Sequence, residues 1–241
     1  RCLPSSTLSK PLLVDQVALG YFHNFDDNSI EASVEAYYKH IGNVADFEDG
    51  TNIMLNENIE AQILIGEGRS YGLELYVKKK FGDVTGWISY TFSRTEQKIE
   101  GINLGEWYPA KYDRSHDISL IVKYQFNERL YLSGTWVFYT GNAVTFPSGQ
   151  YTIDGEVVPY YTERNGYRMP DYHRLDLNLH IKGKESRRFV SSWDISIYNT
   201  YNRYNAYSIY FRESEANPDI PEAVQVTLFG IVPSITYNIE F

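Results

Sequence analysis

The feature that most constrains the fold of this chain is a set of segments in which apolar and polar residues alternate with a period of two. In the last of them, Ile235, Tyr237, Ile239 and Phe241 alternate with polar residues. Alternation over such lengths predicts β-strands with one apolar and one polar face. The sequence predicts nine strands, at about 12–25, 30–39, 71–81, 84–97, 117–126, 130–138, 174–182, 193–211 and 223–241.

The connections between these strands alternate in length. Short turns are expected at 26–29, 82–83, 127–128 and 183–187, and long loops at 45–68, 101–112, 142–171 and 212–221. Aromatic residues recur at one side, as Phe25, Phe81, Phe126 and the terminal Phe241. Short turns on one side, long loops on the other and aromatic residues at strand ends are typical of transmembrane β-barrels.

The composition fits a barrel and excludes a helical membrane protein, because no run of about eighteen apolar residues occurs. The 241 residues include 22 Tyr, 12 Phe and 4 Trp, an aromatic content typical of membrane girdles and of sugar-binding surfaces. The net charge of −9 argues against nucleic acid as a partner. The single cysteine, Cys2, excludes a disulfide framework.

Nine strands cannot close an antiparallel barrel, because the first and last strands then run in the same direction. We therefore expect the remaining strands to come from sequence outside this chain. The chain carries no secretory signal peptide, which is consistent with a processed chain or a fragment. The alternation also changes phase between Leu228 and Ile235, so we expect a β-bulge near residues 230–233.

The polar faces of the strands carry charges of both signs, which we interpret as a polar network facing the lumen of a barrel. They are Glu31, Glu35, Lys39, Glu74, Lys78, Asp117, Lys123, Arg174, Asp176, His180, Lys182 and Asp194.

Two Asp–His pairs raise the possibility of catalysis. Asp113 lies near His116, and Asp171 near His173, each pair where a loop meets a strand. No serine motif accompanies them, so we expect girdle or rim hydrogen bonds and no catalytic residues. The acidic residues of the loop at 46–49 lack the ligand spacing of a Ca²⁺-binding loop, so no metal site is expected either.

Aromatic residues in the long loops are the candidate ligand-binding residues, because exposed rings commonly bind ligands by stacking. Packing of the loops over the barrel mouth is an equally good explanation. The candidates are Trp107, Tyr108, Tyr151, Tyr160, Tyr161 and Tyr167.

Several longer motifs resemble those of one family. Residues 194–211 (DISIYNTYNRYNAYSIYF) are similar to the penultimate strand of TonB-dependent outer-membrane transporters, and residues 168–181 (RMPDYHRLDLNLHI) to the strand before it. Residues 226–241 (VTLFGIVPSITYNIEF) resemble the closing strand of members of the Bacteroidetes type. Residues 68–82 and 109–120 are further matches.

The resemblance implies that residues 12–241 form the C-terminal part of a 22-stranded, plugged barrel in the outer membrane of a Gram-negative bacterium, with residues 1–11 as a lead-in segment or loop. Such proteins take up a scarce, bulky nutrient with energy that TonB transmits through the plug, and they use no cofactor. The implied partners are membrane lipid, the rest of the barrel with its plug, TonB, the nutrient and in some members a surface lipoprotein. A siderophore, a corrinoid, an oligosaccharide and a peptide all remain open as the nutrient.

Two alternatives make different predictions. An outer-membrane barrel enzyme predicts an Asp–His pair within hydrogen-bond reach at the rim, from Asp113 and His116 or from Asp171 and His173. A soluble carbohydrate-binding β-sandwich that uses the tyrosines predicts that the apolar strand faces meet in a closed core. A continuous outward belt that includes Leu73, Leu120 and Leu175 would exclude the sandwich.

Overall fold

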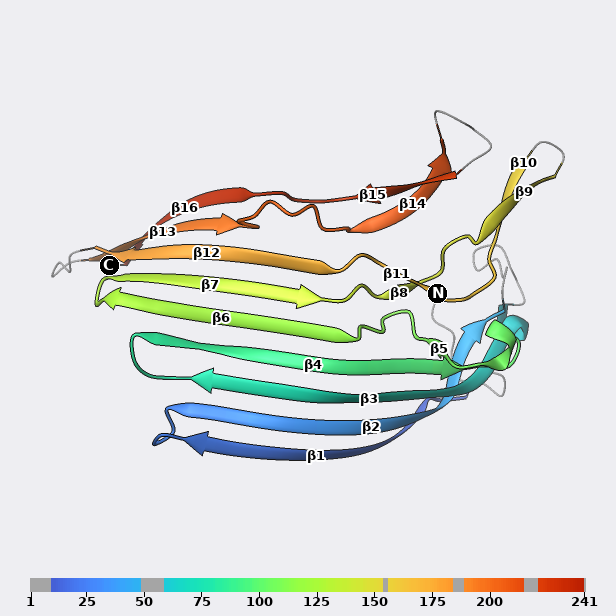
Figure 1. Ribbon diagram of the computed structural model, residues 1–241, viewed down its shortest axis with the longest axis horizontal. Helices are drawn as coiled ribbons and strands as arrows, with labels where there is room; N and C mark the ends of the chain where they lie inside the picture. Colours follow the sequence, from blue (N-terminus) through green and yellow to red (C-terminus); the bar gives the residue numbers. More distant parts are fainter. Residues whose placement is uncertain (1–9, 49–58, 154–155, 184–188, 215–220, 241) are drawn as a thin grey trace.

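The computed structural model of the chain describes residues 10–48, 59–153, 156–183, 189–214 and 221–240. One large antiparallel sheet forms most of it, and three two-stranded sheets lie at the end where the long loops are (Figure 1). None of the described helices is long and apolar enough to cross a membrane.

Nine strands of the large sheet follow one another in chain order, and each pairs antiparallel with the next. They are β1 (Leu13–Phe25), β2 (Ile30–Phe47), β3 (Ile63–Lys79), β4 (Val84–Lys98), β6 (His116–Asn127), β7 (Leu130–Tyr139), β12 (Tyr172–Lys182), β13 (Val190–Tyr198) and β16 (Val232–Glu240). Strands β1 and β16 therefore run in the same direction, toward the short turns, and the sheet does not close on itself. The predicted nine-stranded, antiparallel barrel wall is confirmed.

The remaining elements are short and lie in the long connections. They are η1 (Ile59–Gln62), η2 (Asn103–Gly105), β5 (Tyr108–Pro109), β8 (Ala143–Val144), β9 (Gly149–Ile153), β10 (Glu156–Tyr160), β11 (Tyr167–Arg168), β14 (Ser208–Glu213) and β15 (Pro221–Val226). Strand β5 pairs with the end of β4, and the other six strands form the antiparallel pairs β9–β10, β8–β11 and β14–β15.

The short turn between β1 and β2 shows how the sequence reverses the chain tightly. Asp26, Asp27 and Asn28 all have positive φ, at 49°, 49° and 67°, a conformation that Asp and Asn tolerate better than most residues. The backbone amide of Ser29 donates to the carbonyl of Asp26 at 2.9 Å and closes the turn.

The register places the apolar residues of neighbouring strands side by side on one face of the sheet. Leu120 lies opposite both Ile88 and Trp136, and Trp136 lies opposite Leu175. The same face continues to the two outermost strands, where Leu19 is 80% exposed and Ile235 68% exposed.

This apolar belt matches the outward belt predicted for Leu73, Ile118, Leu120, Leu175 and Leu177. Within the described part of the chain, the strand faces do not meet in a closed core. The soluble β-sandwich alternative is therefore wrong.

Three details of the predicted strands are also wrong. Residues 45–68 were expected to be one loop, but β2 continues to Phe47 and β3 begins at Ile63, with a change of register between Gly42 and Val44. Residues 208–211 do not continue β13, because they form β14 and pair with β15. The phase change near residues 230–233 is an interruption between β15 and β16, whose pairing with β13 is regular from Val232 onward.

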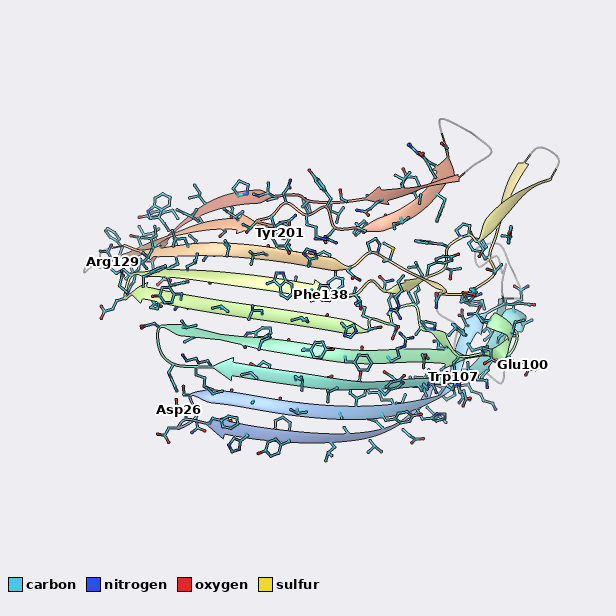
Figure 2. All side chains as sticks on the ribbon, viewed as in Figure 1. Asp26, Glu100, Trp107, Arg129, Phe138 and Tyr201 are labelled. Atoms are coloured by element: carbon cyan, nitrogen blue, oxygen red, sulfur yellow. The ribbon has the colours of Figure 1, made fainter. Side chains whose placement is uncertain are left out.

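The side chains buried from solvent lie at the loop end of the sheet. Val44, Ile99, Ile102 and Tyr108 form a hydrophobic cluster there, and each is at most 5% exposed. Figure 2 shows Glu100 and Trp107 at this end, whereas Asp26 and Arg129 lie at the opposite end, with the short turns. The loops therefore fold over the outer ends of the strands as a packed unit, which we call the loop end.

Candidate functional site

Two adjoining cavities lie at the loop end. The larger has a volume of about 910 Å³ and is bounded by Asp46, Lys111, Phe146 and Arg164, among others. The smaller, of about 310 Å³, lies where β7 and β13 end and β12 begins. Asn142, Met169 and Tyr207 border both cavities, so the two together form one candidate ligand site.

A chain of alternating charges holds the loops on the outer ends of β3 and β4. Arg69 pairs with Glu96 at 2.8 Å, and Glu96 also lies 3.7 Å from Arg94. Arg94 lies 4.0 Å from Asp113, whose carboxylate in turn binds Arg168 of β11. This series of ion pairs therefore links strands β3 and β4 to two separate loops.

Asp113 is the centre of this arrangement and is 2% exposed. Its carboxylate accepts a hydrogen bond from the backbone amide of Thr95 at 2.6 Å as well as from Arg168. Arg168 Nη1 also donates to the carbonyls of Asp113 and Gly141, at 3.0 and 3.2 Å. A buried carboxylate of this kind is stable because it is both paired and hydrogen-bonded.

A second anchor fixes the long loop after β7 to β2 and to η2. Arg164 pairs with Asp46 at 2.8 Å and donates to the carbonyl of Phe47 at 3.0 Å. Asn103 exchanges two hydrogen bonds with the backbone of Arg164, at 2.7 and 2.9 Å. The wall of the larger cavity is thus held by contacts between residues far apart in the sequence.

Asn199 fixes the wall of the smaller cavity and is 1% exposed. Its backbone amide donates to Asp176 at 2.9 Å, and its side chain exchanges hydrogen bonds with the backbone of Arg203 at 2.9 and 3.0 Å. Its φ of 52° is one that Asn adopts more readily than most residues.

Three tyrosines from neighbouring strands form a row on the polar face beside the smaller cavity, and we call Tyr139, Tyr172 and Tyr198 the tyrosine ladder. Tyr139 and Tyr172 lie directly opposite each other and stack with their centroids 4.5 Å apart and their planes within 1°. Arg174 Nη1 donates to the hydroxyls of Tyr172 and Tyr198, at 2.8 Å each, and its guanidinium lies 4.1 Å from the ring of Tyr198.

Arg114 extends the ladder on the side of β6. Its guanidinium lies 4.1 Å from the centroid of the Tyr139 ring, and the side chain is exposed. Because β6, β7, β12 and β13 are consecutive in the sheet, Arg114 and Tyr172 approach Tyr139 from opposite sides. The ladder was missed in the sequence, although aromatic residues on the polar side of three strand ends were a usable signal.

The six aromatic candidates are placed differently. Trp107 is half-buried, 4.2 Å from the guanidinium of Arg69, and Tyr108 packs in the hydrophobic cluster. Tyr160, Tyr161 and Tyr167 are 44%, 55% and 44% exposed. Of Tyr151 the structure describes the backbone, in β9. Among the described side chains, none of the six borders either cavity.

The two Asp–His pairs do not have the geometry that a barrel enzyme predicts, since within the described residues each member is bound elsewhere. His116 Nδ1 lies 2.9 Å from the hydroxyl of Tyr90, while Asp113 binds Arg168. His173 Nδ1 lies 2.7 Å from the hydroxyl of Tyr201, while Asp171 accepts from the amide of Gly141. Both histidines lie at the beginning of a strand, on the apolar face, as girdle residues do.

The polar face carries the predicted network of charges. Arg174 pairs with Asp176 at 2.9 Å, and His180 Nδ1 lies 2.8 Å from Asp194, which also accepts from Asn238 at 2.9 Å. Among the residues described, no three His, Cys, Asp or Glu side chains are grouped to hold a metal ion.

An amphipathic antiparallel sheet with an outward apolar belt, short turns at one end and a folded loop end defines the wall of a transmembrane β-barrel. The model of one family, described as TonB dependent receptor-like, beta-barrel, matches residues 6–202. The chain belongs to this family.

Solved structures of outer-membrane receptors have the same fold. The ferric-catecholate import receptor Fiu from E. coli K12 matches 97% of this chain with 28% of its own, at a TM-score of 0.63 and 14% identity. The ferripyoverdine receptor of the Pseudomonas aeruginosa outer membrane, bound to ferripyoverdine, matches 95% of this chain with 27% of its own length, at a TM-score of 0.60 and 12% sequence identity. The structure of the FpvAI–pyocin S2 complex matches 94% of this chain with 26% of the matched chain, at a TM-score of 0.58 and 11% sequence identity.

The chain thus spans about a quarter of the length of these receptors. No curated protein matches the sequence significantly.

Proposed function

We propose that the chain is part of an outer-membrane receptor that takes up a scarce, bulky nutrient with energy supplied through TonB. Membership of the TonB-dependent receptor family is the observation that carries the proposal. The apolar belt suits contact with membrane lipid. The remaining strands and the plug would come from the rest of the protein, TonB would act through the plug, and a surface lipoprotein is a further partner.

The cavities at the loop end support a binding role at the outer surface. They are bounded by charged, polar and aromatic side chains from several loops. This composition suits a bulky nutrient with polar groups, and the four classes considered are siderophores, corrinoids, oligosaccharides and peptides.

The test is uptake by cells that lack the full-length gene, compared with cells in which it has been restored. Labelled members of the four nutrient classes are offered, with and without a functional TonB. We expect restored, TonB-dependent uptake of one class. Uptake of all four that is unaffected by the deletion, or restored uptake that persists without TonB, would contradict the proposal.

The loop aromatics Tyr160 and Tyr161, with Trp107 and Tyr167, remain part of the proposal as residues that stack on the nutrient. Replacing Tyr160 and Tyr161 together by alanine should weaken nutrient binding to whole cells by about thirty-fold, at about 1 kcal/mol for each ring. Phe81→Ala, at an exposed aromatic residue of the opposite end, is the matched control. Equal binding by the double variant and the control would remove these residues from the site.

A further inference from the structure

The tyrosine ladder differs from an aromatic binding platform because its ring faces are already occupied. Tyr139 has Arg114 against one face and Tyr172 against the other, and Tyr198 is covered by Arg174. Rings stacked across adjacent strands stand upright on the sheet, so they present their edges to the cavity. A flat ligand therefore cannot stack on them as it would on an open ring, and the ladder must act through the groups along its edge.

Hydrogen-bonding groups lie along that edge. Arg174 cannot serve an incoming ligand, because it already binds Asp176 and the hydroxyls of Tyr172 and Tyr198. Arg114 is different, since its guanidinium lies with its flat face against Tyr139 and its N–H groups have no partner among the described residues. Stacking of this kind holds a guanidinium flat while its planar fork of donors stays open, and this fork matches the oxygens of a carboxylate or a phosphate.

The charges of the two cavities favour Arg114 as the cation for a ligand. The larger cavity has Arg164, which Asp46 neutralises, and Lys111, which is exposed. The smaller has Arg114. Among the described residues, neither Lys111 nor Arg114 has a carboxylate within ion-pair distance. Asp117 interacts electrostatically with Arg114 over a longer range. The two cations thus stand on the borders of adjoining cavities.

We propose that Arg114, held flat by Tyr139, binds an oxyanion of the nutrient, a carboxylate or a phosphate, with Lys111 as a second cation nearby. The proposal rests on the proposed function, because the oxyanion bound here would belong to the nutrient. The ladder fixes the direction of the guanidinium, and the bidentate bond then sets the orientation of the nutrient against the wall of the barrel.

The experiment uses the full-length receptor, purified in detergent, with citrate as the carboxylate probe and inorganic phosphate as the phosphate probe. Isothermal titration calorimetry at low ionic strength gives the dissociation constants. We expect at least one probe to bind, and Arg114→Gln to weaken its binding by about ten-fold or more. Arg129→Gln, at an exposed arginine of the short-turn end, should stay within about two-fold of the wild type, because a distant surface charge acts weakly.

Two further variants test the role of the stack. Arg114→Lys keeps the charge but loses the planar fork, so binding should fall by several-fold. Tyr139→Leu removes the support and should weaken binding about as much as Arg114→Gln, whereas Tyr139→Phe keeps the stack and should retain most of it. Wild-type affinity in Arg114→Gln, absence of binding of both probes to the wild type, or equal affinity of Arg114→Lys and wild type would overturn the proposal.

Failure of the subsite and failure of the proposed function give different results. If deletion of the gene leaves all nutrient uptake unchanged, the proposed function fails, whatever the probes do. If the wild type restores TonB-dependent uptake and Arg114→Gln restores it equally and binds the probes equally, the receptor function stands and the subsite is wrong.

Discussion

The sheet and the loop end are held together by opposite means. Across the strands, regular backbone pairing joins residues whose apolar side chains remain exposed, such as Leu19 and Ile235. The buried residues of the described part of the chain lie at the loop end, and they include the hydrophobic cluster around Ile99 and Ile102 and the carboxylate of Asp113. The exposed apolar face of the sheet therefore needs an apolar environment outside the chain, whereas the loop end has a small hydrophobic core of its own.

The largest expected effect is at Asp113. Asp113→Ala removes the acceptor of the Thr95 amide and leaves Arg168 without its carboxylate, and losing one partner of a buried ion pair costs about 3–5 kcal/mol. Hydrogen exchange of the full-length receptor should show faster exchange in the loop end, with unchanged protection in β6 and β7. Asp113→Asn keeps an acceptor and should show a smaller effect. Uniform loss of protection across the sheet would mean that the two regions are not separate units.

A charge on the apolar belt gives the next largest effect. Leu120→Arg places a cation where lipid contact is proposed, which costs about 2–4 kcal/mol near the bilayer centre. The free energy of unfolding of the full-length receptor in lipid vesicles measures it. Ser119→Arg, on the polar face of the same strand, is the matched control and should cost less than about 1 kcal/mol. Equal costs at the two positions would contradict the assignment of the faces.

The smallest effect is expected from relief of backbone strain in η2. Leu104 is fully exposed and has a φ of 58°, a conformation that costs a branched residue about 1 kcal/mol or more. Leu104→Gly should therefore stabilise the loop end by up to about 1 kcal/mol, measured as slower hydrogen exchange there. Leu132→Gly, inside β7, should destabilise instead. Faster exchange in Leu104→Gly would show that the leucine side chain contributes to packing.

The comparison also explains which parts of the structure the sequence could predict. The strands were predictable because each carries its own two-residue period, as in Leu73 to Val77 or Ile118 to Val122. The outer halves of β2 and β3 were missed because glycines and charged residues such as Gly66, Glu67 and Gly68 break the alternation, and the strands change register at Gly42.

The loop end was not predictable in the same way, because its contacts join distant residues. Asn103 binds Arg164, and Asp113 binds Arg168. No local sequence pattern predicts either pair. Hairpin β14–β15 was assigned to the sheet since its residues alternate as sheet residues do. The tyrosine ladder could not be predicted because it requires β7 and β12 to be neighbours, although residues 140–171 separate them in the sequence. The position of Arg114 beside Tyr139 is set by the loop before β6, whose path has no local sequence signal.

The unequal connections also have a kinetic consequence. Hairpins β1–β2, β3–β4 and β6–β7 are joined by turns of a few residues, so their strands meet quickly and with little loss of chain entropy. Pairing β7 with β12 must first close residues 140–171, and each doubling of a loop costs about 0.6 kcal/mol. The three hairpins are therefore expected to form as early units, and the anchors at Asp113, Arg164 and Asn199 to become ordered only after the hairpins have joined.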